Sequence, residues 1–380
     1  MRSRILLAVF IVAALPSCGG EEFAEANELE SYRMIGLAGV RSTVDERPES
    51  PAPDLYLDEI FSPDGVEVSI QMVDFDPEGA DRRYRHTLCL SVGAPTRFEC
   101  LAPESALRCG HGVEASEGCV ADGPRAVFQL NLATTAGLLA ILGGDPGAQG
   151  ETGDQGADCA AILDGLGSLV EAAQAGCPVS FPIPIIVRTE VIGPDESIKV
   201  AARSVKVRLP QSFLETALSG CDVTFPSTPV MPSSGMDQAC MEEVDGRARN
   251  RNPSVTAITV GDRTETEVDS ETGCLRFPAA GVIGAQVPIS VSLSPCSVER
   301  FLAYSTLDGC VVRSEADLGP AAMTFYADSG ELLFGNRRLE EGETKLTLPL
   351  LPGLTRLYVA VRDGRNGLDV ACADIESVSP

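Results

Sequence analysis

Short segments with apolar residues at every second position recur along the chain. Four clear examples are residues 66–72, 287–293, 346–350 and 357–361. A period of two sends alternate side chains to opposite faces of an extended chain, so each segment predicts a half-buried β-strand. Many short strands of this kind, separated by turn residues, are typical of a β-sandwich or a β-barrel.

Further apolar runs extend this pattern. We expect additional strands at residues 33–41, 84–92, 183–191, 198–209, 255–260 and 370–375. Gly193, Pro194 and Asp195 separate two of these strands, and the sequence Asp-Gly-Arg-Asn-Gly at 363–367 precedes the last one. Because such residues favour tight turns, the chain is expected to reverse direction at both places.

Residues 128–177 do not follow the strand pattern. Residues 128–142 begin strand-like and continue as an Ala- and Leu-rich helix candidate, and residues 159–175 carry apolar side chains at helical spacing. Between them, five Gly-x-x triplets run from Gly144 to Gly156. Collagen uses this period, but five triplets in one chain do not make a triple helix, so we expect a mobile acidic loop within a helical insertion.

These patterns divide the chain into two predicted β domains, and the predicted fold class is mainly β. The first domain spans residues 33–209 and includes the helical insertion at about 128–177. Residues 210–251, which contain several prolines, form the predicted linker, and residues 252–380 form the second domain. Two domains suit this length, because single hydrophobic cores stop growing at about 250–300 residues.

The first twenty residues have a different pattern. Arg2 and Arg4 precede an apolar run at residues 5–15, and small residues follow it. A basic start, a short apolar segment and small residues before a cleavage point are typical of a secretory signal peptide. The apolar run of 11 residues is too short to cross a bilayer as a helix, which takes about 20 residues.

Residues 15–18, Leu-Pro-Ser-Cys, resemble the lipobox of bacterial lipoproteins. This resemblance implies that residues 1–17 are a cleaved signal peptide, that lipid is attached to Cys18 and that residues 18–32 form an acidic tether. Gly19 directly after the cysteine implies sorting to the outer membrane. The alternative is a plain secretory signal, with Cys18 as a disulfide partner.

Cysteine content agrees with export. The chain has 13 cysteines, and removing Cys18 for the lipid leaves an even number, 12. An even set of cysteines at short spacings in an exported protein indicates disulfide bonds, although spacing does not fix which cysteines pair. Sequence neighbours suggest the pairs Cys89–Cys100, Cys109–Cys119, Cys159–Cys177 and Cys221–Cys240. Four cysteines then remain to pair among themselves: Cys274, Cys296, Cys310 and Cys372.

The charge of the chain limits its partners. Lys and Arg total 29 against 55 Asp and Glu, a formal net charge of −26. Loss of Arg2 and Arg4 with the signal peptide would leave 27 basic residues, and hence −28. Because such a surface repels phosphate groups, nucleic acid is excluded as a partner, and membrane contact is expected through the N-terminal lipid.

The strongest local group of ligand-type side chains is acidic. Asp74, Asp76, Glu78 and Asp81 follow one another at the end of the strand predicted at 66–72. Alternating carboxylates can supply the hard oxygen ligands that Ca²⁺ prefers, so Ca²⁺ is the one cofactor that these residues suggest. The alternative is a solvated acidic turn.

Other chemistry lacks a sequence signature. The two histidines, His86 and His111, have no further ligands at metal-site spacing, and His111 is expected at the surface. The chain contains no Gly-x-Ser-x-Gly, no Gly-x-Gly-x-x-Gly, no P-loop and no His-Glu-x-x-His. We therefore predict no catalytic residue and expect that the protein is not an enzyme.

Several segments together resemble a known class of proteins. They are the lipobox, residues 33–41, residues 73–79, residues 250–253 and residues 358–367. With these segments the chain is similar to exported bacterial lipoproteins of the deltaproteobacterial type, which carry immunoglobulin-like or PKD-like β-sandwich domains. The resemblance implies that the two predicted domains are immunoglobulin-like β-sandwich domains, the first with the helical insertion. It also implies a cell-envelope protein without known enzymatic activity. The chain departs from the antibody pattern because it contains no Trp.

Three functional hypotheses follow. The first is a lipid-anchored envelope protein that acts as a non-enzymatic structural or interaction module with an unknown protein or glycan partner. The second is a lipoprotein that binds a glycan or Ca²⁺. The third is an envelope hydrolase that uses a pair of carboxylates, since 55 acidic residues offer many pairs.

Overall fold

The computed structural model describes most of two long stretches of the chain. The described residues are 32–42, 55–77, 79–91, 100, 103–131, 133–134, 167, 169–180, 185–210, 212, 214–215, 218, 221, 223–224, 252–270, 272–294, 297, 300–314, 322–337, 342–365 and 367–380. Their strands lie in six sheets, and the protein is mainly β, as its alternating pattern predicts. None of the helices in this part of the chain is long and apolar enough to span a membrane.

Two four-stranded sheets form the N-terminal sandwich. The first has the order β1 (Arg33–Ser42), β3 (Val66–Phe75), β7 (Arg125–Leu130) and β6 (Cys119–Asp122). The second has the order β10 (Ile198–Val205), β9 (Ile185–Ile192), β4 (Arg83–Leu90) and β5 (Leu107–Gly110). All neighbouring strands in both sheets are antiparallel.

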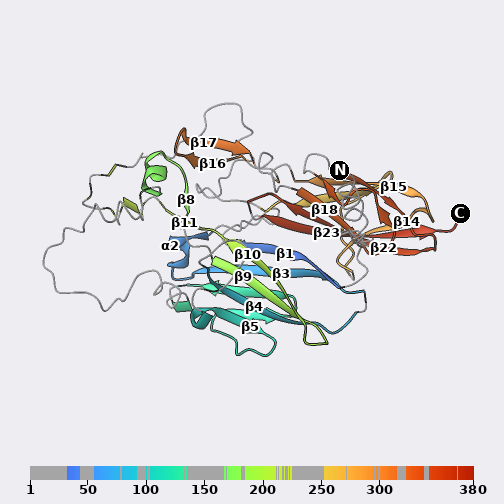
Figure 1. Ribbon diagram of the computed structural model, residues 1–380, viewed down its shortest axis with the longest axis horizontal. Helices are drawn as coiled ribbons and strands as arrows, with labels where there is room; N and C mark the ends of the chain where they lie inside the picture. The colour runs from blue at the N-terminus through green and yellow to red at the C-terminus, as the bar shows by residue number, and fades with distance from the viewer. Residues whose placement is uncertain are drawn as a thin grey trace, which may run out of the picture.

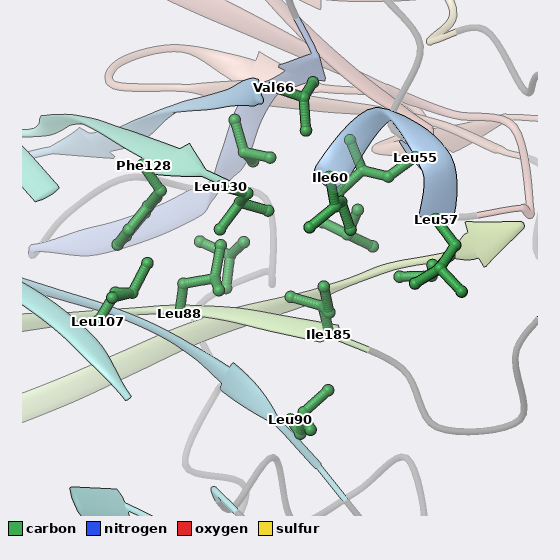
Figure 2. Close-up of a cluster of buried hydrophobic side chains, with 14 of the residues drawn as sticks. Leu55, Leu57, Ile60, Val66, Leu88, Leu90, Leu107, Phe128, Leu130 and Ile185 are labelled. Atoms are coloured by element: carbon green, nitrogen blue, oxygen red, sulfur yellow. The ribbon is translucent and has the colours of Figure 1, made fainter. Parts of the chain in front are cut away.

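Apolar side chains fill the space between these two sheets. Phe128 and Leu130 from one sheet meet Leu88, Leu107 and Ile185 from the other, and all are buried (Figure 2). The alternation in β3 works as predicted, because each of its apolar positions at 66–72 points into this cluster while the intervening polar positions do not. The predicted β-sandwich is thereby confirmed for this half of the chain.

A small three-stranded sheet closes one end of the N-terminal sandwich. It consists of β2 (Leu55–Tyr56), β11 (Val207–Leu209) and β8 (Val179–Ser180), and the short helix α2 (Leu57–Ile60) follows β2. One more single turn, η1 (Pro103–Ser105), lies ahead of β5. The strand predicted at 198–209 is wrong in its extent, because the chain leaves the β10 ladder at Lys206 and pairs with β2 instead. Arg208 of β11 is buried.

Two five-stranded sheets form the C-terminal sandwich (Figure 1). One has the order β13 (Arg263–Glu265), β12 (Val255–Val260), β15 (Gln286–Leu293), β21 (Glu343–Thr347) and β19 (Glu331–Leu332). The other has the order β14 (Leu275–Val282), β23 (Leu368–Val378), β22 (Gly353–Arg362), β18 (Ala322–Ala327) and β20 (Asn336–Arg337). Ile258, Ile289, Phe277, Phe325 and Val359 pack between the sheets without exposure to solvent.

The turns predicted from local sequence are confirmed. Gly193, Pro194 and Asp195 connect the antiparallel strands β9 and β10. Residues 363–367 connect β22 and β23, which pair antiparallel along ten residues each. In both places turn-favouring residues lie between two apolar segments, which is the strongest short-range signal for a hairpin.

The two sandwiches meet through a third apolar cluster. Ile35 of β1 packs with Tyr358, Ala360 and Leu368 of the C-terminal sandwich, and the ring of Phe75 meets the ring of Tyr358 edge-on at 6.1 Å. Ile35 reaches this interface because it is the extra residue of a β-bulge, where the pairing of β1 with β3 shifts. β22 is therefore buried on both faces, and the half-buried strand predicted at 357–361 is wrong in this respect.

A hairpin from the C-terminal half also contacts the N-terminal half. It is formed by β16 (Arg300–Ser305) and β17 (Gly309–Ser314). Cys310 in this hairpin is disulfide-bonded to Cys177, and Tyr304 donates a hydrogen bond of 3.1 Å to Glu171. Tyr304 and Cys310 both pack against the core of the N-terminal sandwich.

Disulfides confirm part of the expected pairing and correct another part. Cys89–Cys100 and Cys109–Cys119 form as expected, and Cys274–Cys372 lies within the group of four. The expected Cys159–Cys177 pair is wrong, as is the pairing of Cys310 within that group, because the β16–β17 hairpin brings Cys310 to Cys177. Cys221 is also disulfide-bonded. Four cysteines lie outside the described residues: Cys18, Cys159, Cys240 and Cys296.

The strand-like start predicted for residues 128–142 is confirmed. β7 continues to Leu130, so residues 128–130 belong to the sandwich and the insertion follows them. Residues 133–134, 167 and 169–174 are helical, and Val170, Ala172 and Ala173 are buried. The glycine triplets at 144–156, the tether and most of the linker at 210–251 lie outside the described residues, and the predicted domain boundaries stay predictions.

Candidate functional site

A cavity of about 580 Å³ opens at the edge of the N-terminal sandwich. We call it the edge cavity. Its wall comes from the start of β4, the end of β5, and β6 with the turn that follows it, including Arg83, His111, Val120 and Gly123. β5 and β6 are edge strands of opposite sheets, and the Cys109–Cys119 disulfide joins them within the wall. The cavity is therefore held by a covalent link between the two sheets.

The local sequence explains how the chain turns around this cavity. Gly110 at the end of β5 has a φ of +108°, a conformation that favours glycine. A Cβ at this position would clash with the carbonyl oxygen of Tyr84 on β4. The amide of the next residue, His111, donates a hydrogen bond of 2.8 Å to the same oxygen. Glycine thus allows the close approach that places the His111 side chain beside β4.

Arg83 joins His111 to the neighbouring β9–β10 turn. Its Nη1 lies 3.1 Å from Nε2 of His111, and its Nη2 donates to Oε1 of Glu196 at 2.7 Å. Because a guanidinium has only donors, Nε2 of His111 accepts the bond, and the proton of this imidazole is on Nδ1. The Arg83 side chain is 30% exposed and that of Glu196 is 75% exposed. Ion pairs this exposed are weak, so the anionic group of a ligand can replace Glu196.

Arg82 also lines the cavity, and two further arginines pair with Glu190 on the neighbouring strand β9. Arg85 and Arg188 both contact Glu190, at 2.9 and 2.7 Å, on different carboxylate oxygens. Arg85 Nε also donates to the backbone oxygen of His111 at 3.4 Å. Basic side chains thus concentrate near this edge of a chain that is otherwise strongly acidic.

His86 lies behind the cavity and is fully buried. Its Nε2 donates to the carbonyl of Gly123 at 2.9 Å, and its Nδ1 accepts from the Thr189 hydroxyl at 2.9 Å. Both ring nitrogens thus have a partner when the imidazole is neutral. Burial lowers the pKa of His86, and the bond to the Gly123 carbonyl opposes part of that shift.

Asp74 belongs to a tyrosine network next to the cavity. Its Oδ2 accepts hydrogen bonds from the hydroxyls of Tyr32 at 3.1 Å and Tyr84 at 2.9 Å. Burial raises the pKa of Asp74, and the two tyrosine hydrogen bonds and Arg82 counteract that rise. The pKa values of Tyr32 and Tyr84 are raised as well, first by burial and then by the Asp74 charge.

The other residues of the predicted calcium group have different surroundings. Asp76 accepts from Nε of Arg82 at 2.8 Å and from the amide of Ala80 at 3.1 Å, and Asp81 is exposed. Within the described residues, no group of three or more metal-ligating side chains is present. Glu78 lies outside those residues, so the calcium site stays a prediction.

Sequence reasoning missed the arginines of this site. Arg82, Arg83 and Arg85 lie within four consecutive residues at the start of β4, in a chain where acidic residues outnumber basic ones. That concentration of positive charge is the sequence feature from which the site could have been predicted. The links from Arg85 to Glu190 and from Arg83 to Glu196 were not visible, because they depend on how β9 pairs with β4. The expected surface position of His111 is confirmed.

Comparisons with known proteins give no family. No protein-family model matches the chain, and no curated protein matches it. Among solved structures, the D0–D1 domain of intimin is 8% identical, with 91% of this chain and 99% of that chain covered and a TM-score of 0.19. The two tandem V-type regions of VCBP3, a v-region-containing chitin binding protein, are 8% identical, with 92% and 99% covered and a TM-score of 0.24.

A third solved structure is SGBP-B of the Bacteroides ovatus mixed-linkage glucan utilisation locus, in complex with a mixed-linkage heptasaccharide. It is 11% identical, with 92% of this chain and 71% of that chain covered and a TM-score of 0.15. Superpositions at these scores carry no structural argument. The assignment to β-sandwiches therefore rests on the sheets and cores of this molecule itself.

Proposed function

We propose that the protein is an exported, lipid-anchored envelope protein that works as a non-enzymatic binding module. In this proposal Cys18 carries the lipid, the sandwiches form a cross-linked body, and the edge cavity takes the ligand. The observation that carries the proposal is the cavity itself, where a disulfide-linked wall holds Arg83 and His111 at an opening to solvent. Oxidised cysteines throughout the body support export, because disulfides persist in oxidising compartments.

The proposed ligand is a glycan with acidic sugars. Arg83 can exchange the exposed Glu196 for a sugar carboxylate, and arginine binds carboxylates through two parallel hydrogen bonds. Exposed His111 offers a polar edge for hydroxyl groups, and Val120, which is 71% exposed at the cavity, offers an apolar contact for a sugar ring. A few polar groups set among apolar ones are typical of small-ligand sites.

Binding of trigalacturonate and of neutral maltotriose to the mature protein tests this proposal. We expect trigalacturonate to bind more tightly, and Arg83→Gln to weaken its binding at least tenfold. Arg276→Gln is the matched control, because Arg276 is exposed on β14 of the other sandwich. Equal binding of the two sugars, or equal loss in both variants, would reject the site. Recovery of shortened trigalacturonate would reject the non-enzymatic part of the proposal.

The lipid anchor has a separate test. The mass of the mature protein from its native envelope should match a start at Cys18 with acyl chains attached. Reduction should then add about 2 Da for each disulfide, since each bridge takes up two hydrogens. A product without lipid, with Cys18 in a disulfide, would contradict the anchor and leave the edge cavity unaffected.

A structural role is the second candidate, supported by the contacts between the sandwiches. The Cys177–Cys310 bond and the cluster around Ile35 and Tyr358 link the two halves at different places. Such a body would hold a fixed distance between its anchor and a partner. Single-molecule stretching of the oxidised protein should then show no extension between the sandwiches before one of them unfolds.

A further inference from the structure

A second cavity, of about 450 Å³, lies where the two sandwiches meet. We call it the joint cavity. Its wall combines β1 and β10, the edge strands of the two N-terminal sheets, with the β22–β23 turn of the C-terminal sandwich. Two of its lining side chains, Arg203 and Arg362, carry a charge, and the others are apolar or glycine, among them Met34, Leu37, Val200 and Leu368.

Arg203 is buried with neutral partners. It is 8% exposed, Nη1 donates to the backbone oxygen of Leu37 at 3.0 Å, and Nη2 donates to Oδ1 of Asn252 at 2.9 Å. A guanidinium has five N–H groups, so three remain beyond these two bonds. No ion pair between Arg203 and a carboxylate is found in the part of the chain that the structure describes.

Among the residues that the structure describes, Asp363 is the carboxylate that acts on this charge, without a direct contact. Its Oδ1 accepts the amides of Arg365 at 2.6 Å and Gly367 at 2.7 Å, so it shapes the β22–β23 turn. Burial lowers the pKa of Arg203 to about 10, an effect that Asp363 opposes and Arg362 reinforces. The positive charge at the joint is thus incompletely balanced, and buried charge without a close partner is costly.

The charges around the cavity define the class of ligand. Arg203, Arg362 and Asp363 together carry a net charge of +1, which one monoanion neutralises. A planar guanidinium fork suits a carboxylate, and the apolar lining suits a hydrocarbon chain. Val200 in the lining is 43% exposed, so the cavity has access to solvent. Its volume is in the usual range of small-ligand pockets, about 300–1,000 Å³.

We propose that the joint cavity binds a monocarboxylate with a small aliphatic body, whose carboxylate lies between Arg203 and Arg362. The hydrocarbon part contacts Met34, Leu37 and Leu368, which come from both sandwiches. Binding therefore stabilises the contact between the two halves. This proposal is independent of the function proposed for the edge cavity, because the two cavities share no lining residue.

Titration calorimetry on the oxidised mature chain tests the proposal with three probes. Hexanoate carries both the charge and the apolar body, 1-hexanol lacks the charge, and inorganic phosphate lacks the apolar body. We expect hexanoate to bind with a Kd near or below about 1 mM, and both other probes to bind at least tenfold more weakly. Equal binding of phosphate, or no heat with hexanoate, would overturn the proposal.

Variants and a spectroscopic readout locate the site. Arg362→Gln changes a partly exposed lining residue and should weaken hexanoate binding at least tenfold, while Arg276→Gln should leave it unchanged. The ¹⁵Nε resonance of Arg203 should shift with hexanoate in the unmodified protein, a readout that does not require removing Arg203. Binding that is unchanged in Arg362→Gln, or that leaves this resonance in place, would contradict the assignment.

Discussion

The two cavities both contain arginine, and the surroundings of the two guanidinium groups are opposite. Arg83 at the edge cavity is partly exposed, and a still more exposed carboxylate, Glu196, balances its charge. Arg203 at the joint cavity is buried, and its hydrogen-bond acceptors are neutral. Water already stabilises the charge of Arg83, so a ligand that binds at the edge cavity would gain specificity from this residue more than affinity. At the second, a bound anion would add to the compensation that Asp363 supplies without a direct contact.

Disulfide removal should give the largest difference between the two regions. Cys177–Cys310, which links the two halves, closes 133 residues, whereas Cys109–Cys119 at the edge cavity closes 10. Because constraint of the unfolded chain grows with loop length, replacing both cysteines of the first pair with serine should cost about 5 kcal/mol, and of the second about 3 kcal/mol. Denaturant unfolding of the two double variants measures both values. A larger loss from the shorter loop would contradict this account.

Replacement of an arginine should give the second-largest difference in stability between the two cavities. Arg203→Met leaves the carbonyl of Leu37 and one bond of Asn252 without a donor, so the free energy of unfolding should fall by about 2–4 kcal/mol. Arg83→Met, the matched change at the edge cavity, should cost less than about 1 kcal/mol, because it removes an exposed ion pair. Urea unfolding measures both. Equal losses would show that burial does not distinguish the two sites.

Acidification should change the free energy of unfolding through one titratable residue in each region, and the two changes should have opposite signs. The folded pKa of His86 lies below its unfolded value of about 6.5, so the stability it contributes is present above that pH and is lost as pH falls through the folded pKa. Asp369, beside Leu368 of the joint, has a pKa raised by burial against its hydrogen bonds from Val255 and Val370. Its contribution is present below about pH 3.9 and is lost as pH rises through the folded pKa.

The variants His86→Gln and Asp369→Asn test these signs. Each variant should remove one residue's contribution to the pH dependence of the free energy of unfolding. That contribution is at most about 1.4 kcal/mol per pH unit. Unfolding measured in urea from pH 4 to pH 8 gives the slopes. His86→Gln should reduce the loss of stability on acidification, and Asp369→Asn should increase it. The same direction of change in both variants would contradict the opposite pKa shifts of His86 and Asp369.

The smallest effect on stability is expected from Glu196→Gln. This change removes the exposed partner of Arg83, so unfolding should change by less than about 1 kcal/mol. Trigalacturonate should bind the variant more tightly, because no protein carboxylate then competes for Arg83. The measurement is calorimetry at low salt, with Glu376→Gln on β23 as the exposed control. Weaker binding to the Glu196 variant would mean that Glu196 contacts the ligand.

Local features of the fold could be predicted from the sequence, and the contacts between the halves could not. The period of two located β3 and β15, and the turn residues at 193–195 located the β9–β10 hairpin, because strand faces and tight turns depend on neighbouring residues. Cys177 pairs with a partner 133 residues away, and no local spacing indicates that choice.

At the contact between the two sandwiches, the sequence pattern favoured one feature of the fold but did not establish it. Residues 357–361 of β22 are apolar throughout, including Tyr358 and Ala360, and such runs are typical of strands buried on both faces. That run was the available signal for a second packed face. Arg203 had no such signal, since one arginine among small apolar residues of β10 is equally typical of a solvent-facing position. Its burial depends on Asn252, which reaches it from the other half.

The bond between Cys177 and Cys310 also sets an order of events during biogenesis. A chain emerges from its N-terminus, so Cys177 becomes available 133 residues before its partner. In that interval the nearest thiol in sequence is Cys159, with which it does not pair in the finished molecule. Correct maturation therefore requires that Cys177 stay reduced, or that an early wrong bridge be reshuffled, until the β16–β17 hairpin arrives. Yield of native protein should accordingly depend on a disulfide isomerase more strongly than on the oxidant.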